Sequence, residues 1–279
     1  MSARPLPAGA VAPDAPDLGP GEVRLWLADP EAAADPGLAG AYLRLLNTEE
    51  RARAARFRVA ADRHAFLVAH ALVRCTLSRF AAVAPEDWRF DFNRQGKPSV
   101  AACHQDAQHL RFNLSHTRSL VVLALAAGRD LGVDVETRNP QLDLAVAERF
   151  FHPREAATLR GLPECDQRGR FVDLWTLKES YVKARGAGLS MPLDGFSFDL
   201  DTPGRIGLSF EPGIDDCAAR WCFVQFGPDA RHQVALCAER SAHPLSLALT
   251  RCVPLRDEWP VDWQAIRCTA GCGGGSDSR

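Results

Sequence analysis

The chain has 279 residues, of which 46% are hydrophobic, so it can bury a full core in one large domain or two small ones. Its formal net charge of -2 gives no global positive field for a nucleic-acid partner. The sequence has no apolar run of about 18 residues and no basic, then apolar, N-terminal pattern. We therefore expect a cytoplasmic protein with no membrane span, no signal peptide and no nucleic-acid partner.

The nine cysteines are scattered, odd in number and free of paired C-x-x-C sets. This pattern favours reduced thiols and predicts neither a disulfide framework nor a zinc site. Cys268 and Cys272 fall in a Gly/Ser-rich tail and are interpreted as incidental.

The first third of the chain predicts a tail, a strand and two helices. Residues 1–20 are rich in Ala, Pro and Gly and are expected to be disordered. Glu22–Ala28 alternates as a strand does. A capping signal at Asn47 predicts a helix that begins near Thr48, and a second, apolar helix is expected at about Ala61–Val83.

A turn follows the next predicted strand, Trp88–Phe92. Gly96 and Pro98 place a turn at residues 93–98, with Lys97 at its tip. Only three of the 33 basic residues are lysines. Lys supplies a compact, titratable ammonium that Arg cannot imitate. The rarity of Lys therefore favours a functional role for Lys97 over that of an ordinary solvent-exposed residue.

Ser115 and His116 lie between two predicted structured pieces, the second being a buried strand at Leu120–Ala127. A hydroxyl, an imidazole and backbone N–H groups at such a place can meet a phosphate. The Ser–His dipeptide is not a catalytic dyad by itself, because sequence neighbours on a strand point apart. The sequence also lacks a G-x-S-x-G elbow.

Two carboxylates share one face of the predicted strand Leu131–Glu136. Asp134 and Glu136 are two residues apart, so they face the same way while Val133 and Val135 face the core. Such a pair can seat a hard divalent cation such as Mg²⁺. A solvent-facing strand edge is the alternative interpretation.

The later part of the chain predicts more helix and then strands. A helix is expected after Pro153, a polar loop at residues 161–169 and a helix at Phe171–Ser190 that Gly186 and Gly188 end. Antiparallel strands are expected at residues 195–200, 206–210, 221–226 and 234–239, and another at 245–252.

The helix Phe171–Ser190 combines an acid with a base. Trp175, Glu179 and Lys183 are four residues apart and therefore share a face. An exposed Glu–Lys pair worth about 0.3–0.5 kcal/mol is the alternative interpretation. Two of the three lysines, Lys178 and Lys183, fall in this helix. Their position favours the functional interpretation of the helix over an exposed Glu–Lys pair.

Taken together, these pieces resemble the 4′-phosphopantetheinyl transferases, specifically the longer single-chain (Sfp-type) branch. Five motifs carry the resemblance, in the family's order and at similar separations, over roughly residues 22–226. They are Gly96-Lys-Pro98, Phe112-Asn-Leu-Ser-His116, Gly132-Val-Asp-Val-Glu136, Phe150-Phe-His-Pro-Arg-Glu155 and Trp175-Thr-Leu-Lys-Glu-Ser-Tyr-Val-Lys183.

The resemblance implies an α+β fold of two similar halves in pseudo-twofold arrangement, each an antiparallel sheet packed with a long helix. We place the N-terminal half at residues 21–127, the C-terminal half at 128–267 and a flexible tail at 268–279. A faint repeat between residues 55–63 and 148–155 agrees with two related halves, and we expect a monomer.

The implied reaction moves the 4′-phosphopantetheine arm of coenzyme A to a serine of an apo carrier protein, releasing 3′,5′-ADP. The carrier would be an acyl or peptidyl carrier protein of a fatty-acid, polyketide or nonribosomal peptide synthase. Two rival functions are a Mg²⁺-dependent nucleotide phosphotransferase or hydrolase, although no P-loop motif is present, and a catalytically inactive coenzyme A-binding protein.

The resemblance also assigns roles to individual residues. Asp134, Glu136 and Glu179 would hold Mg²⁺ on the coenzyme's diphosphate. Glu179 would also act as the base for the incoming serine, and Lys183 would stabilise or protonate the leaving phosphate.

Further residues would bind the coenzyme itself. Ser115 and His116 would contact its phosphates, and the turn Gly96-Lys97-Pro98 would line the adenine end. Arg53 matches a basic position that faces the 3′-phosphate. The basic position before it is Glu50 in this chain, so Arg51 or Arg56 is the expected substitute.

Overall fold

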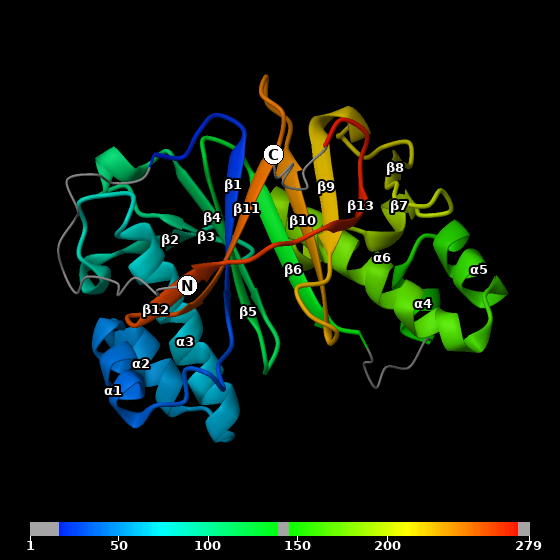
Figure 1. The fold of residues 1–279 in the computed structure, drawn as a ribbon. Helices are drawn as coiled ribbons and strands as arrows, with labels where there is room; N and C mark the ends of the chain where they lie inside the picture. Colours follow the sequence, from blue (N-terminus) through cyan, green and yellow to red (C-terminus); the bar gives the residue numbers. More distant parts are fainter. Residues whose placement is uncertain (1–16, 139–144, 273–279) are drawn as a thin grey trace. The chain divides into compact units, whose positions relative to one another are not determined.

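The computed structural model describes residues 17–138 and 145–272, which fall into two compact units (Figure 1). Unit 1 comprises the described residues up to 92 together with 98–128 and 247–262. Unit 2 comprises residues 93–97, 129–246 and those from 263 onward. Each unit combines helices with antiparallel strand pairs, so the predicted α+β class is confirmed.

In unit 1 one helix, α3 (Ala60–Leu77), packs against a sheet, and two further helices pack on α3. These two are α1 (Pro36–Leu45) and α2 (Thr48–Ala55). The strands are β1 (Glu22–Ala28), β2 (Phe90–Phe92), β3 (Pro98–Val100), β4 (Leu110–His116), β5 (Val121–Ala127), β11 (Ser246–Val253) and β12 (Asp257–Pro260). Five of them form a sheet in the order β12-β11-β1-β5-β4, and β2 pairs with β3 separately.

Unit 2 packs one long helix against a four-stranded sheet. The helices are α4 (Ala145–Phe150), α5 (Pro153–Gly161) and α6 (Glu164–Arg185). The strands are β6 (Leu131–Thr137), β7 (Phe196–Asp199), β8 (Gly207–Phe210), β9 (Trp221–Phe226), β10 (His232–Glu239) and β13 (Ala265–Cys268). The sheet order is β13-β9-β10-β6, and β7 pairs with β8.

The described residues also form short 3-10 helices at Pro85–Asp87, Gln105–Ala107, Gly188–Ser190, Leu193–Gly195 and Ala218–Arg220. Among the described residues, no helix has the length and apolar character needed to cross a bilayer.

Helix α6 is built around apolar residues at helical spacing. Phe171, Leu174, Leu177 and Tyr181 are all buried in the core of unit 2. Gly186 follows the last turn with φ of 62°, a left-handed conformation that glycine adopts without strain, so the predicted stop at this residue is confirmed.

A buried ion pair between Lys178 and Glu155 also holds α6 in place. Lys178 is fully buried, and its Nζ lies 2.8 Å from Glu155 Oε2 while donating to the backbone oxygens of Leu193 and Phe196. Glu155 in turn accepts from the backbone N–H of Phe198. The pair joins α5, α6 and β7, so Lys178, one of the three lysines, has a structural role.

Several predicted boundaries were correct and others were wrong. The strand Glu22–Ala28 and the helix start at Thr48, with its Asn47 cap, are confirmed. The polar loop predicted up to residue 169 is wrong, because α6 already begins at Glu164. The second helix ends at Leu77 instead of Val83.

The chain also departs from a simple division into halves. Residues 247–262 belong to unit 1, because β11 lies beside β1 in the five-stranded sheet. Leu18, which lies in the predicted disordered tail, is buried in the core of unit 1. The rest of that tail up to residue 16, and residues 273–279, lie outside the described part. The pseudo-twofold relation of the halves stays a prediction.

Two of the cysteines are paired, which corrects the expectation of free thiols throughout. Cys222 on β9 forms a disulfide with Cys272, 50 residues later in the chain. Residues as far as 272 are thereby attached to the unit 2 sheet, so Cys272 is not incidental. Sequence spacing alone did not reveal the pair, because no local motif joins the two positions.

Candidate functional site

Strand β6 and helix α6 bring four of the predicted site residues together within unit 2. Lys183 Nζ donates to Asp134 Oδ1 at 2.6 Å. Asp134 also interacts electrostatically with Glu136 and Glu179. The alternation of the strand and the four-residue spacing of the helix therefore place one row of polar side chains against another. We call Asp134, Glu136, Glu179 and Lys183 the acidic cluster.

Gly132 sets the distance between these two rows. A Cβ at this position would lie 2.1 Å from Ser180 O and 2.3 Å from Ala184 N, both backbone atoms of α6. Only a glycine therefore lets the helix backbone approach the strand this closely. The signal in the sequence is a glycine inside a strand pattern, two residues before Asp134.

Burial and repulsion disfavour the charged forms of Glu136 and Glu179. Loss of water, and then the charge of Asp134, raise the pKa of Glu136 to about 7, although Lys183 and a hydrogen bond from the Trp175 indole oppose this. The same two causes raise the pKa of Glu179. A bound cation would lower the pKa of both Glu136 and Glu179, since it adds an attraction that offsets their repulsion.

The donor set of the acidic cluster is of the kind that Mg²⁺ takes, namely carboxylate oxygens. Asp134 is buried, and Glu136 and Glu179 are half-buried. Within residues 17–138 and 145–272, no three His, Cys, Asp or Glu side chains are already arranged as a metal site. The chemistry of the residues fits a cation, and binding would require rotation of the side chains.

The pKa of Glu136 predicts how stability depends on pH. An acid whose pKa rises from its ordinary 4.5 to about 7 on folding binds its proton more tightly in the native state, so it destabilises the fold as pH rises through that window. Metal-free Glu136→Gln should match the parent protein near pH 4.5. It should be more stable at pH 8 by about 1 kcal/mol, after allowance for solvent screening of a half-buried group.

Urea denaturation of both proteins at the two pH values measures this difference. A stability difference that stays constant between them would contradict the assignment of Glu136.

The predicted turn at residues 93–98 is present, but Lys97 does not point away from the protein at its tip. The Asn93 side-chain oxygen accepts from the backbone N–H of Lys97, and Gly96 has a φ of 86°. Lys97 Nζ donates to Leu131 O and Ala184 O, at 3.2 and 2.8 Å. Its ammonium therefore joins the start of β6 to the end of α6, and Pro98 begins β3.

The remaining predicted coenzyme residues belong to unit 1. Ser115 and His116 are the last two residues of β4, so they lie within a strand and not between elements as expected. Ser115 is buried and His116 exposed. Arg53 and Arg56 are exposed on or just after α2. That these residues meet the acidic cluster at one coenzyme stays a prediction.

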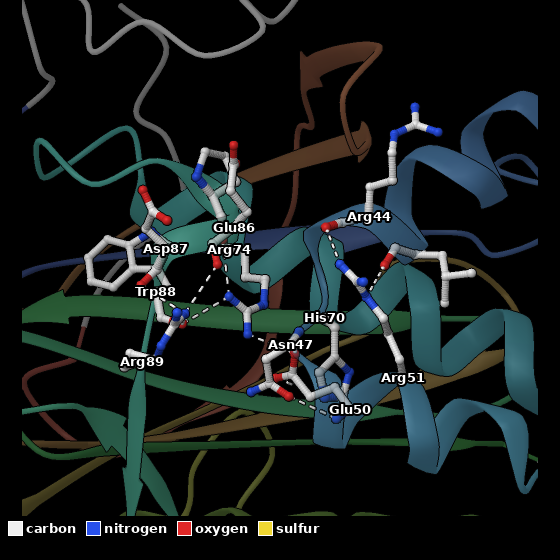
Figure 2. A network of polar contacts seen from close by, with 12 residues as sticks. Arg44, Asn47, Glu50, Arg51, His70, Arg74, Glu86, Asp87, Trp88 and Arg89 are labelled. Carbon is white, nitrogen blue, oxygen red and sulfur yellow. Dashed lines mark hydrogen bonds and ion pairs between the residues drawn. The ribbon is translucent and has the colours of Figure 1, made fainter.

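Glu50, at the position where the resemblance predicts a basic residue, has a structural role (Figure 2). Its side chain accepts from the backbone N–H of Asn47 and, at 2.7 Å, from Arg74. Arg74 is buried and also donates to Trp88 O and Pro85 O. The Glu50 carboxylate therefore supplies the negative charge that compensates the buried Arg74 guanidinium.

Arg51 is likewise used by the fold. Its guanidinium donates to Leu43 O and Arg44 O near the end of α1, and Figure 2 shows the contact with Arg44. This contact argues against Arg51 as a substitute phosphate ligand and leaves Arg53 and Arg56 as the candidates on this stretch.

We expect Glu50→Gln to lower the free energy of unfolding by about 2 kcal/mol, because Arg74 loses the charge that compensates its burial. Chemical denaturation measures the change. Glu49→Gln, one residue earlier and exposed, is the control and should leave stability unchanged. A Glu50→Gln variant as stable as the control would show that the Arg74 pair is not needed.

Comparisons with known proteins find matches over most of the chain. Residues 38–128 match a family model described as 4′-phosphopantetheinyl transferase, N-terminal, and residues 130–237 match that of the 4′-phosphopantetheinyl transferase superfamily. The chain is 32% identical over 203 residues to 4′-phosphopantetheinyl transferase Sfp of Bacillus subtilis, covering 73% of this chain and 85% of the relative.

Other relatives match at similar levels. The chain is 34% identical over 212 residues to 4′-phosphopantetheinyl transferase HetI of a Nostoc species, covering 75% of this chain and 84% of that protein. It is 32% identical to a phosphopantetheinyl transferase of a Thraustochytrium species, covering 71% of each.

Proposed function

Since the chain belongs to the 4′-phosphopantetheinyl transferase superfamily, we propose that it transfers the 4′-phosphopantetheine arm of coenzyme A to a serine of an apo carrier protein, releasing 3′,5′-ADP. The observation that carries the proposal is the similarity to named transferases over most of the chain, combined with the acidic cluster of unit 2. The carrier would be an acyl or peptidyl carrier protein of a fatty-acid, polyketide or nonribosomal peptide synthase.

Asp134, Glu136 and Glu179 would hold Mg²⁺ at the coenzyme's diphosphate. When bound, the ion supplies positive charge to the phosphate oxygens. The charge of Asp134 contributes to the raised pKa of both Glu136 and Glu179, and this repulsion supports a cation between the three acids. Transfer at phosphorus depends mainly on in-line positioning and on neutralising charge.

Glu179 would take the proton of the incoming serine, directly or through a water. Its carboxylate is half-buried on α6 beside Asp134 and would supply the oxygen that accepts this proton. The serine oxygen then forms a bond to phosphorus, the diphosphate P–O bond breaks, and 3′,5′-ADP leaves with the electron pair.

Lys183 would stabilise the leaving phosphate or donate a proton to it. Its ammonium lies against Asp134, and the Lys183 side chain is one-quarter exposed, so Lys183 is held within the acidic cluster while it remains accessible to a ligand. Arg53, Arg56, Ser115 and His116 would contact phosphates of the coenzyme, and the turn Gly96–Pro98 would line its adenine end.

Incubation with labelled coenzyme A, Mg²⁺ and an apo carrier protein tests the proposal. Mass spectrometry should show the carrier gaining the phosphopantetheine arm. Hydrolysis of coenzyme A without transfer would favour the rival hydrolase, and retention of intact coenzyme A without turnover would favour an inactive binding protein. Either of these two results would contradict the proposal.

A further inference from the structure

Gln233 lies beside the acidic cluster, although nothing in its local sequence marks it. In the antiparallel pair of β10 and β6, Gln233 is directly opposite Glu136. Directly opposite residues share a face of the sheet, with Cβ atoms about 4.5–5.5 Å apart. Gly132, Asp134 and Glu136 alternate onto the face that α6 covers, so Gln233 faces α6 as well.

The side chain of Gln233 has an unused donor. The residue is only 1% exposed, and its Nε2 is buried with no hydrogen-bond acceptor anywhere in residues 17–138 or 145–272. A buried donor without an acceptor costs free energy, so such groups are rare in folded proteins. This one lies next to a carboxylate.

A second glutamine on the same face provides the contrast. Gln225 on β9 is opposite Ala235, which is itself opposite Asp134 on β6. It is fully buried, and its Nε2 donates to Asp173 O at 2.8 Å and to Thr176 Oγ1 at 3.1 Å. The fold therefore satisfies the glutamine that lies away from Glu136 and leaves the donor unused on the glutamine beside it.

We propose that Gln233 is a positioning residue that donates through Nε2 to the Glu136 carboxylate and fixes it in the orientation that binds the cation. The inference rests on the proposed function. The Trp175 indole already donates to Glu136 from α6, so Gln233 would hold the same carboxylate from the strand side. Its amide carries no charge and therefore does not compete with the cation for the acids, as an ammonium would.

Outer partners of this kind matter for metal sites. Carboxylate ligands are commonly hydrogen-bonded by a second layer of residues, whose loss weakens metal binding by about 10–100-fold. We therefore expect Gln233→Met, which keeps the volume of the side chain and removes the amide, to weaken cation binding by about 10-fold or more.

The test measures Mn²⁺ binding to the full chain in the presence of coenzyme A, by electron paramagnetic resonance of free Mn²⁺, together with urea unfolding of the metal-free protein. Gln233→Met should lose Mn²⁺ affinity and keep at least the stability of the parent. Gln225→Met, the matched control, should lose stability and keep Mn²⁺ affinity.

Parental Mn²⁺ affinity in Gln233→Met would overturn this inference alone. A loss of metal-free stability in Gln233→Met as large as that in Gln225→Met would also overturn it, because the amide would then be satisfied within the fold. Absence of Mn²⁺ binding to the parent, or parental binding by Asp134→Ala, would overturn both the inference and the proposed metal site.

Discussion

Transfer of the phosphopantetheine arm should fall by about 10³-fold or more when Asp134 is replaced by alanine. Asp134 is the buried centre of the acidic cluster, since Lys183 binds it and its charge acts on both Glu136 and Glu179. A cation at the diphosphate contributes several kcal/mol to stabilising the transition state, which corresponds to a rate factor of this size. Intact-mass spectrometry of the carrier over time gives the rate.

The same variant should remain folded. Lys183 is one-quarter exposed, so its ammonium can recover water after the carboxylate is removed. Asp173→Asn is the control, because Asp173 is another partly buried acid on α6 that is ion-paired with Arg267 and lies outside the acidic cluster. Asp173→Asn should lower the stability of the protein and leave the rate of transfer unchanged. Normal carrier modification by Asp134→Ala would remove Asp134 from the site.

Replacing Gly132 by alanine should destabilise the protein by about 3 kcal/mol, the upper end of the usual cost of overpacking, and abolish most of the transfer. The added methyl group would fall 2.1 Å from Ser180 O and 2.3 Å from Ala184 N, and backbone atoms cannot move aside as a flexible side chain can. Helix α6 must therefore shift away from β6. Because the helix carries Glu179 and Lys183, both leave their positions beside Asp134.

Gly169→Ala is the matched control for this substitution, since Gly169 lies within the same helix and a Cβ there meets nothing within 4 Å. It should stabilise the protein by about 0.5–1 kcal/mol and leave transfer unchanged. Urea denaturation and the transfer assay separate the two variants. Equal stability of Gly132→Ala and the parent protein would contradict the close helix–strand packing.

The acidic cluster was predictable because its geometry follows from two local periods. Strand alternation puts Asp134 and Glu136 on one face, and four-residue spacing puts Trp175, Glu179 and Lys183 on one face of a helix. Motif resemblance indicated that these two faces meet. Apolar spacing and Gly186 likewise predicted the end of α6.

Other features depend on partners far away in the sequence. The register that places Gln233 beside Glu136 and the pairing of Cys222 with Cys272 leave no local pattern. The first turns of α6 were missed because residues 164–170 are mostly polar and carry no apolar period. The role of Glu50 depends on Arg74, which reaches it from α3.

Lysine rarity marks positions with structural contacts as well as the candidate functional position. Lys183 lies in the acidic cluster, but the ammonium groups of Lys178 and Lys97 bind backbone oxygens inside unit 2, and Lys178 also pairs with Glu155. A compact ammonium suits these crowded positions for structural reasons as well. Residue rarity therefore identified three lysines in unusual environments, and of these Lys183 is the one in the acidic cluster.

The magnesium dependence of arm transfer tests the central claim most directly. Protein stripped with EDTA should leave an apo carrier protein unmodified in the presence of coenzyme A, and adding Mg²⁺ should restore the mass increase of the carrier. Transfer at the same rate with and without the chelator would contradict the assignment of Asp134, Glu136 and Glu179 to a cation at the diphosphate.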